Sequence, residues 1–210
     1  TYSELQTAVG DWLHRADLTT RIPDFIKFGE TVLNRSLRLF SMENSSTVTT
    51  STTDRFGTLP TGFLEAIDLA LYSDNYPQTL TQVSLSEINF RDTTSKRLPH
   101  YYAISSNIVF DTISDQAYSC SLRYYKKLDI ATDLTNSVLT NYPDLYLYSS
   151  LLSAAPYINN DARLQTWGIL LKDGIKMTNH LDAKTRGRAQ LMTEPGLRHG
   201  QRGDIFTGDV

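Results

Sequence analysis

Nucleophilic catalysis requires a serine or cysteine within reach of a histidine and an orienting carboxylate. The one cysteine, Cys120, falls on the inner face of a predicted strand, where a small buried thiol is expected. The sequence has no GxSxG motif. Its histidines are far apart and lie in no catalytic signature: His14, His100, His180 and His199. We therefore predict that the chain is not an enzyme.

Metal and phosphate sites are equally poorly supported. The sequence contains no CxxC, HExxH or EF-hand motif, and residues 159–161 (NND) are typical of a helix cap. The glycines at 196, 200 and 203 follow no predicted strand and begin no helix, so they do not form a phosphate-binding loop. We predict no metal ion and no cofactor.

The residues best suited to binding lie at the C-terminus. The 210 residues have a net charge of −3, but residues 184–210 have five basic and three acidic side chains. This stretch also has five glycines and few apolar residues, which is typical of an extended arm. The arm could contact nucleic-acid phosphates, an acidic groove on a protein, or only water; its apolar residues favour a protein. The candidate binding residues are Arg186, Arg188, Leu197, Arg198, His199, Arg202, Ile205 and Phe206.

Four tyrosines near the middle of the second half of the sequence suggest another kind of surface. Tyr142, Tyr146, Tyr148 and Tyr157 could stack on a ligand such as a sugar. Tyrosines along a pair of helices are more often half-buried in a core or placed at a protein interface, and we favour that interpretation.

The first forty residues predict a pair of helices. Ser3 and Gln6 have the spacing of a capping box, and Pro23 suits the first turn of a second helix. The second helix is expected to bury Ile22, Phe25, Ile26, Gly29, Leu33 and Leu37.

A second pair of helices is predicted after Tyr142. Pro143 suits a helix start, and Pro156 should bend or end that helix. Asn160 or Asp161 can cap the next helix. That helix has one apolar face, formed by Leu164, Trp167, Leu171, Ile175 and Thr178.

Between the two helix pairs the sequence has the period of two that is typical of strands. The Ser/Thr-rich stretch 44–53 predicts an extended edge with a polar face, and residues 85–91 a short helix. Further strands are expected near 67–71, 78–83, 101–104, 108–111 and 118–126, the last three as an antiparallel meander.

These elements predict an α+β fold: a discontinuous antiparallel helical bundle with an inserted antiparallel β-domain and an extended C-terminal arm. The expected boundaries are residues 1–40 plus 142–183 for the bundle, 44–127 for the β-domain and 184–210 for the arm. The absence of an apolar run of about 20 residues predicts that no segment spans a membrane. The single cysteine and the lack of a signal peptide favour synthesis in a reducing cytoplasm.

Five short motifs occur along the chain: residues 22–26 (IPDFI), 124–127 (YYKK), 136–139 (NSVL), 143–148 (PDLYLY) and 160–163 (NDAR). Through their combination the sequence bears a resemblance to the adaptor, or head-to-tail connector, proteins of short-tailed bacteriophages. The resemblance implies a structural virion protein made in the host bacterial cytoplasm. Such proteins form a homo-oligomeric ring, commonly of twelve subunits, beneath the portal and receive the tail nozzle and fibres.

In this interpretation the candidate residues of the arm bind the portal protein, and DNA passes only as cargo through the ring. Two alternatives stay open: a nucleic-acid-binding module that uses the basic arm, and a small hydrolase of the virion. The net negative charge argues against nucleic acid as the principal ligand.

Overall fold

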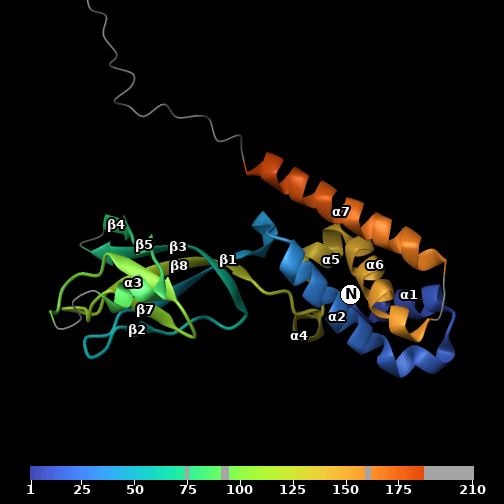
Figure 1. The fold of residues 1–210 in the computed structure, drawn as a ribbon, viewed down its shortest axis with the longest axis horizontal. Coiled ribbons are helices and arrows are strands. Elements are labelled where there is room, and N and C mark those ends of the chain that lie inside the picture. The colour runs from blue at the N-terminus through green and yellow to red at the C-terminus, as the bar shows by residue number, and fades with distance from the viewer. Residues whose placement is uncertain (74–75, 91–94, 159–161, 187–210) are drawn as a thin grey trace, which may run out of the picture.

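The structure, a computed structural model, describes residues 1–73, 76–90, 95–158 and 162–186. It has an α+β fold, as the sequence predicts, with helices and strands segregated into two lobes that lie end to end (Figure 1). Both ends of the described chain contribute to the helical lobe, and the segment between them forms the β lobe. The chain therefore crosses twice between the lobes.

The N-terminal part of the helical lobe contains α1 (Tyr2–Leu13), η1 (Ala16–Arg21), α2 (Ile22–Ser36) and η2 (Phe40–Met42). Pro23 lies in the first turn of α2, and the whole predicted buried face of that helix is buried, which confirms both expectations. The expected capping box on Ser3 and Gln6 is wrong. Helix α1 begins earlier, because the Thr1 hydroxyl accepts a hydrogen bond from the Glu4 amide and the Glu4 carboxylate returns to the Thr1 nitrogen.

The C-terminal part contains α4 (Ile130–Asp133), α5 (Ser137–Asn141), α6 (Pro143–Ser153), η3 (Ala155–Tyr157) and α7 (Arg163–Thr185). Pro143 begins α6, and α6 ends before Pro156, as predicted. The expected caps Asn160 and Asp161 lie outside the described residues. Helix α7 runs to Thr185, so the first two residues of the predicted arm are helical.

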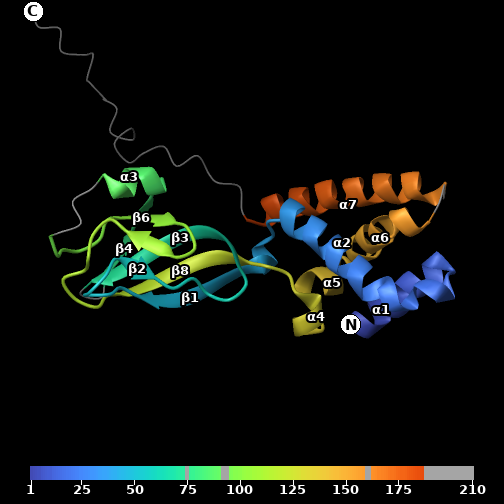
Figure 2. The same ribbon diagram turned by 60° about the horizontal axis from the view of Figure 1, so that its bottom comes forward.

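Helix α6 lies at the centre of the helical lobe, with α1 and α7 on either side of it (Figure 2). The third neighbour is α2, which approaches α6 so closely that a Cβ on Gly29 would lie 2.8 Å from the backbone of Ser149 and Ser150. A glycine is needed here because the obstacle is backbone, which cannot turn aside. One core of buried side chains joins these four helices.

The β lobe contains two four-stranded sheets, in the orders β1-β8-β3-β4 and β2-β7-β6-β5. Among the described strand pairs only β5–β6 is parallel. The elements are β1 (Glu43–Thr49), β2 (Phe56–Gly57), β3 (Phe63–Ser73), β4 (Tyr76–Thr79), β5 (Thr81–Gln82), α3 (Leu85–Asn89), β6 (Tyr101–Ile104), β7 (Ile108–Phe110) and β8 (Ser119–Lys126).

The two sheets face each other across a separate apolar core that includes Leu71, Ile108, Phe110, Cys120 and Leu122. Helix α3 covers the opposite face of the second sheet. The predicted antiparallel meander of the last three strands is wrong, because β8 leaves β6 and β7 and pairs between β1 and β3 in the other sheet. The period-two pattern of residues 118–126 correctly predicts a strand. Which strands β8 pairs with depends on residues distant in sequence.

Candidate assembly interfaces

The groups that could do chemistry are not brought together in the described part of the chain. Cys120 is buried between the sheets, and burial raises the pKa of its thiol to about 12, so the reactive thiolate is disfavoured. Residues 1–73, 76–90, 95–158 and 162–186 contain no group of three or more His, Cys, Asp or Glu side chains placed to hold a metal ion. None of the described helices combines the length and apolar character that crossing a bilayer requires.

The four tyrosines considered as a stacking surface have different environments. Tyr146 is buried completely, whereas Tyr142 and Tyr148 are partly buried against the helical core. Tyr157 packs on Phe25 with a ring-centroid distance of 5.2 Å. Tyr146 is therefore part of the helical core, and Tyr142 and Tyr148 pack against it.

Of the eight candidate residues of the arm, only Arg186 lies within the described residues. Arg188, Leu197, Arg198, His199, Arg202, Ile205 and Phe206 lie outside them. Arg186 follows the end of α7, and its guanidinium makes contacts with three separate parts of the chain.

Nε of Arg186 donates to Asp182 in α7 at 2.5 Å, and Nη1 donates to Glu43 at the start of β1 at 2.5 Å. Nη2 donates to the backbone carbonyl of Arg38, 3.1 Å away, in the segment after α2. The hydrogen bond with Asp182 raises the pKa of Arg186 above its usual value, so the guanidinium stays charged.

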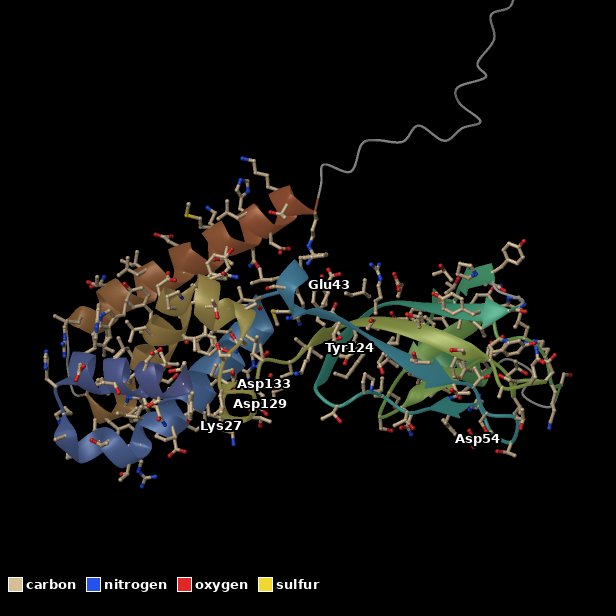
Figure 3. All side chains as sticks on the ribbon, turned by 180° about the vertical axis from the view of Figure 1, so that it is seen from behind. Lys27, Glu43, Asp54, Tyr124, Asp129 and Asp133 are labelled. Carbon is tan, nitrogen blue, oxygen red and sulfur yellow. The ribbon has the colours of Figure 1, made fainter. Side chains whose placement is uncertain are left out.

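The ring of Tyr125, at the end of β8, supports the same contacts. The guanidinium carbons of Arg38 and Arg186 lie 5.9 and 5.7 Å from its centroid, within the range of cation–π attraction. Arg38 also donates from Nε to Glu65 in β3 at 2.6 Å. We call Arg38, Glu43, Tyr125, Asp182 and Arg186 the junction cluster; Figure 3 shows Glu43 and the neighbouring Tyr124 where the lobes meet.

The junction cluster changes the expected role of Arg186. Its donors are used within the chain, and Glu43 and Asp182 are themselves mostly buried. The cluster therefore fixes the place at which the chain continues beyond α7, relative to both lobes.

A second polar network holds the returning chain inside the helical lobe. Oε1 of Glu30, a residue only 7% exposed, accepts hydrogen bonds from the Ile130 amide at 2.8 Å and the Tyr146 hydroxyl at 2.9 Å. Nδ2 of Asn136 donates to that hydroxyl at 2.7 Å. One turn further along α2, the Asn34 side chain exchanges two hydrogen bonds with the backbone of Leu128.

Burial raises the pKa of Glu30, and it raises the pKa of Tyr146 as well. The network has a structural role, because it is buried, its donors are paired, and it connects α2 to the segment that leaves the β lobe.

The outer surface of the helical lobe has a groove of about 670 Å³ along α6. Its α1 wall includes Glu4, Leu5 and Ala8, and its floor includes Asp144 and Leu147. Beyond this floor, the side chains of Trp12, Tyr148 and Trp167 meet, with ring centroids 6.1 and 6.5 Å from Trp12. The groove is therefore partly apolar and is also lined by two carboxylates, those of Glu4 and Asp144.

Apolar side chains also project from two helices. On α2, Phe28 is 60% exposed and Val32 is 38% exposed, one turn apart. On α7, Leu170, Met177 and Leu181 are exposed along one stripe. Contiguous exposed apolar residues of this kind mark interaction sites more often than isolated ones do.

Neither these surfaces nor the junction cluster was predicted from the sequence. A signal for the α2 surface was present, since Phe28 and Val32 are apolar, are four residues apart and lie off the predicted buried face. The junction cluster had no such signal, because its members come from three stretches that are far apart in sequence, residues 38–43, residue 125 and residues 182–186.

A comparison with protein families identifies the chain. The model of the family described as SU10 adaptor protein matches residues 1–194, and the chain belongs to this family. No curated protein matches the sequence. The chain is therefore a structural adaptor of a phage virion, which confirms the resemblance to phage adaptors; the short-tailed type of the phage stays a prediction.

Proposed function

We propose that this adaptor joins the portal to the tail. In this proposal the helical lobes form a homo-oligomeric ring beneath the portal, and the C-terminal arm docks on the portal protein. The β lobe receives the tail nozzle and the tail fibres. A ring of twelve subunits is proposed from the resemblance to phage connectors alone.

The observation that carries the proposal is the junction cluster. Arg186 ties the end of α7 to Glu43 of the β lobe and to the backbone of Arg38. Residues 187–210 therefore begin from a defined place, as an arm must if it is to reach a neighbour in one geometry. An arm that orders on docking would also make assembly sequential, because the ordering entropy is lost only when a portal is present.

The β lobe supports the part of the proposal that concerns later tail components. Phe56, Tyr76 and Phe90 project from it, and Tyr76 and Phe90 are among the most exposed large apolar residues described. Aromatic side chains with a polar surrounding are the residues that protein interfaces use as anchors.

Deletion of residues 197–210 tests the role of the arm. The truncated protein is expected to fold with an unchanged circular dichroism spectrum and to be lost from portal rings in a co-sedimentation assay. Arg186 is retained, so the junction cluster is intact. Retained portal binding would contradict the proposed role of the arm.

Two full-length variants separate the contributions within the arm. One replaces Leu197, Ile205 and Phe206 by serine, and the other replaces Arg188, Arg198 and Arg202 by glutamine. Docking in an apolar groove predicts the larger loss for the serine variant. A larger loss for the glutamine variant, with retention on DNA that falls steeply with salt, would favour the nucleic-acid alternative.

A further inference from the structure

We infer that the outer face of α2 of one subunit docks in the groove along α6 of the next subunit, so that these two surfaces form the lateral contact of the ring. The inference rests on the proposed ring and names the residues that build it. We call the first surface the α2 ridge (Lys27, Phe28, Thr31, Val32 and Arg35) and the second the α6 groove (Glu4, Leu5, Ala8, Asp144 and Leu147).

Helix α2, which carries the ridge on its outer face, and the groove lie on different sides of α6. Helix α2 covers the side of α6 that carries Tyr146, Ser149 and Ser150, because Glu30 bonds Tyr146 and Gly29 lies against the two serines. By helical spacing Asp144 is on the other side of α6 and Leu147 lies between the two sides, and both line the groove. The ridge points away from this whole arrangement, since the buried face of α2 is turned to α6.

Placement on different sides is what a ring needs. A closed ring is built from heterologous contacts, in which one patch of each subunit meets a different patch of the next. Two copies of a single patch would give a two-fold dimer instead. A protruding apolar ridge on one face and a partly apolar groove on the other form such a pair.

The charges of the two surfaces are complementary. Lys27 and Arg35 are exposed beside Phe28 and Val32, and neither forms an ion pair with any described residue. The groove is lined by the carboxylate of Asp144 and by that of Glu4, which also accepts a hydrogen bond from the Thr1 ammonium at 2.8 Å. Opposite charges around an apolar centre set the orientation of a contact and suppress wrong partners.

Helix α7 extends the groove on its far side. A Cβ on Gly174 would touch Leu145 and come within 3.6 Å of an Asp144 carboxylate oxygen, so this face of α7 lies at the rim of the groove. Leu170, Met177 and Leu181 fall on the same face by their spacing of four, three and four residues around Gly174. A docked ridge would therefore cover exposed apolar residues of both helices.

Paired cysteines test the contact in complexes that co-sediment with portal rings. Val32→Cys and Ala8→Cys are combined in one chain, and the complexes are treated with a short bismaleimide. The expected result is a ladder of covalent oligomers on a denaturing gel, because each subunit joins the next. The buried Cys120 does not react, so the unsubstituted protein is the control.

The single variants give the direction of the contact. Val32→Cys alone and Ala8→Cys alone should form no covalent product, and their mixture should form dimers and nothing larger. Dimers from either single variant would overturn the inference, because they would show a two-fold contact. Co-sedimentation of the double variant without a ladder would overturn it as well, while the adaptor function would stand. Failure of the unsubstituted protein to bind portal rings would count against the proposed function itself.

A charge reversal checks the electrostatic part. Arg35→Glu should lower the cross-linked fraction about tenfold, and Asp144→Lys in the same chain should restore most of it. Lys176→Glu on α7 makes the same change of charge outside both surfaces and should have no effect. An equal loss for Arg35→Glu and Lys176→Glu would show that net charge, and not this contact, matters.

Discussion

The two lobes hold distant segments together by different means. The β lobe is continuous in sequence from Glu43 to Lys126, and its two sheets meet over apolar side chains. The helical lobe is assembled from both sides of that insertion, and its halves are joined by the Glu30 network and by the tight contact at Gly29. Apolar packing tolerates small shifts, whereas a buried hydrogen-bond network and a backbone contact define one register.

This difference indicates that the helical lobe is the part in which one exact register of the packed segments is needed. Within the β lobe some strands pair with their neighbours in sequence, as β3 does with β4, whereas β8 returns to pair with β1 and β3. Helix α6 must find α2 across the whole inserted lobe, and there a buried hydrogen bond and a backbone contact fix the match. The helical lobe is also the part to which we assign the ring contacts, so errors in its register would be copied into each neighbour.

Removing Glu30 should have the largest effect on the comparison. Glu30→Leu leaves the Tyr146 hydroxyl and the Ile130 amide without their acceptor, at about 1–3 kcal/mol each. We expect the free energy of unfolding of the helical lobe to fall by about 2–6 kcal/mol. Hydrogen exchange should show the loss at residues 128–146, with little change in the strands. An equal loss of hydrogen-exchange protection in both lobes would show that the two lobes do not unfold independently.

Glu30→Gln is the matched variant, because its amide oxygen can still accept both hydrogen bonds. Burial raises the pKa of Glu30 above its ordinary value of 4.5, so in the folded protein the neutral form is favoured. The contribution of Glu30 to stability is therefore greatest at low pH and falls as the pH rises through its raised pKa. As the pH rises from 4.5 through the raised pKa of Glu30, the free energy of unfolding of Glu30→Gln should therefore increase relative to that of the unsubstituted protein.

Gly29→Ala should have an intermediate effect. Its Cβ would lie 2.8 Å from backbone atoms of α6, so the two helices must separate, at a cost of about 1–3 kcal/mol. Gly168→Ala in α7 is the control, since a Cβ there meets no atom within 4 Å and alanine favours a helix by up to about 1 kcal/mol. Thermal unfolding of the two variants should shift in opposite directions. A neutral Gly29→Ala would mean that α2 and α6 are less tightly held than described.

The smallest effect is expected in the β lobe. Nε of Arg123 donates to Asp68 at 2.9 Å on the outer surface of the first sheet, where the arginine is largely exposed. Exposed ion pairs contribute less than about 1 kcal/mol, and added salt screens them. Arg123→Gln should therefore change the unfolding midpoint only slightly, and not at all in high salt. A loss comparable to that of Glu30→Leu would remove the contrast between the lobes.

Much of the fold follows from local patterns. The buried face of α2, the start of α6 at Pro143 and the inward position of Cys120 on its strand are properties of short segments, and the structure agrees with each. The helices α4 and α5 were not predicted, because four or five residues contain too little periodicity to be identified. The position of β8 was also missed, since strand pairing is decided by the whole lobe.

The candidate surfaces were harder to predict than the fold. The arm was identified by its composition, which needs no structure, but Arg186 was assigned to a partner although its donors are used internally. Its acceptors Glu43 and Asp182 are 139 positions apart in sequence. Only the folded chain places them around one guanidinium.

The junction between the lobes also has a mechanical consequence. The polypeptide passes from one lobe to the other twice, before Glu43 and after Lys126, and the Arg186 side chain adds a third connection. A single covalent link would act as a swivel, and two would allow bending about the line between them. Three attachment points resist both motions, so a pull or twist applied to the β lobe is transmitted to the helices as load and is not dissipated as rotation.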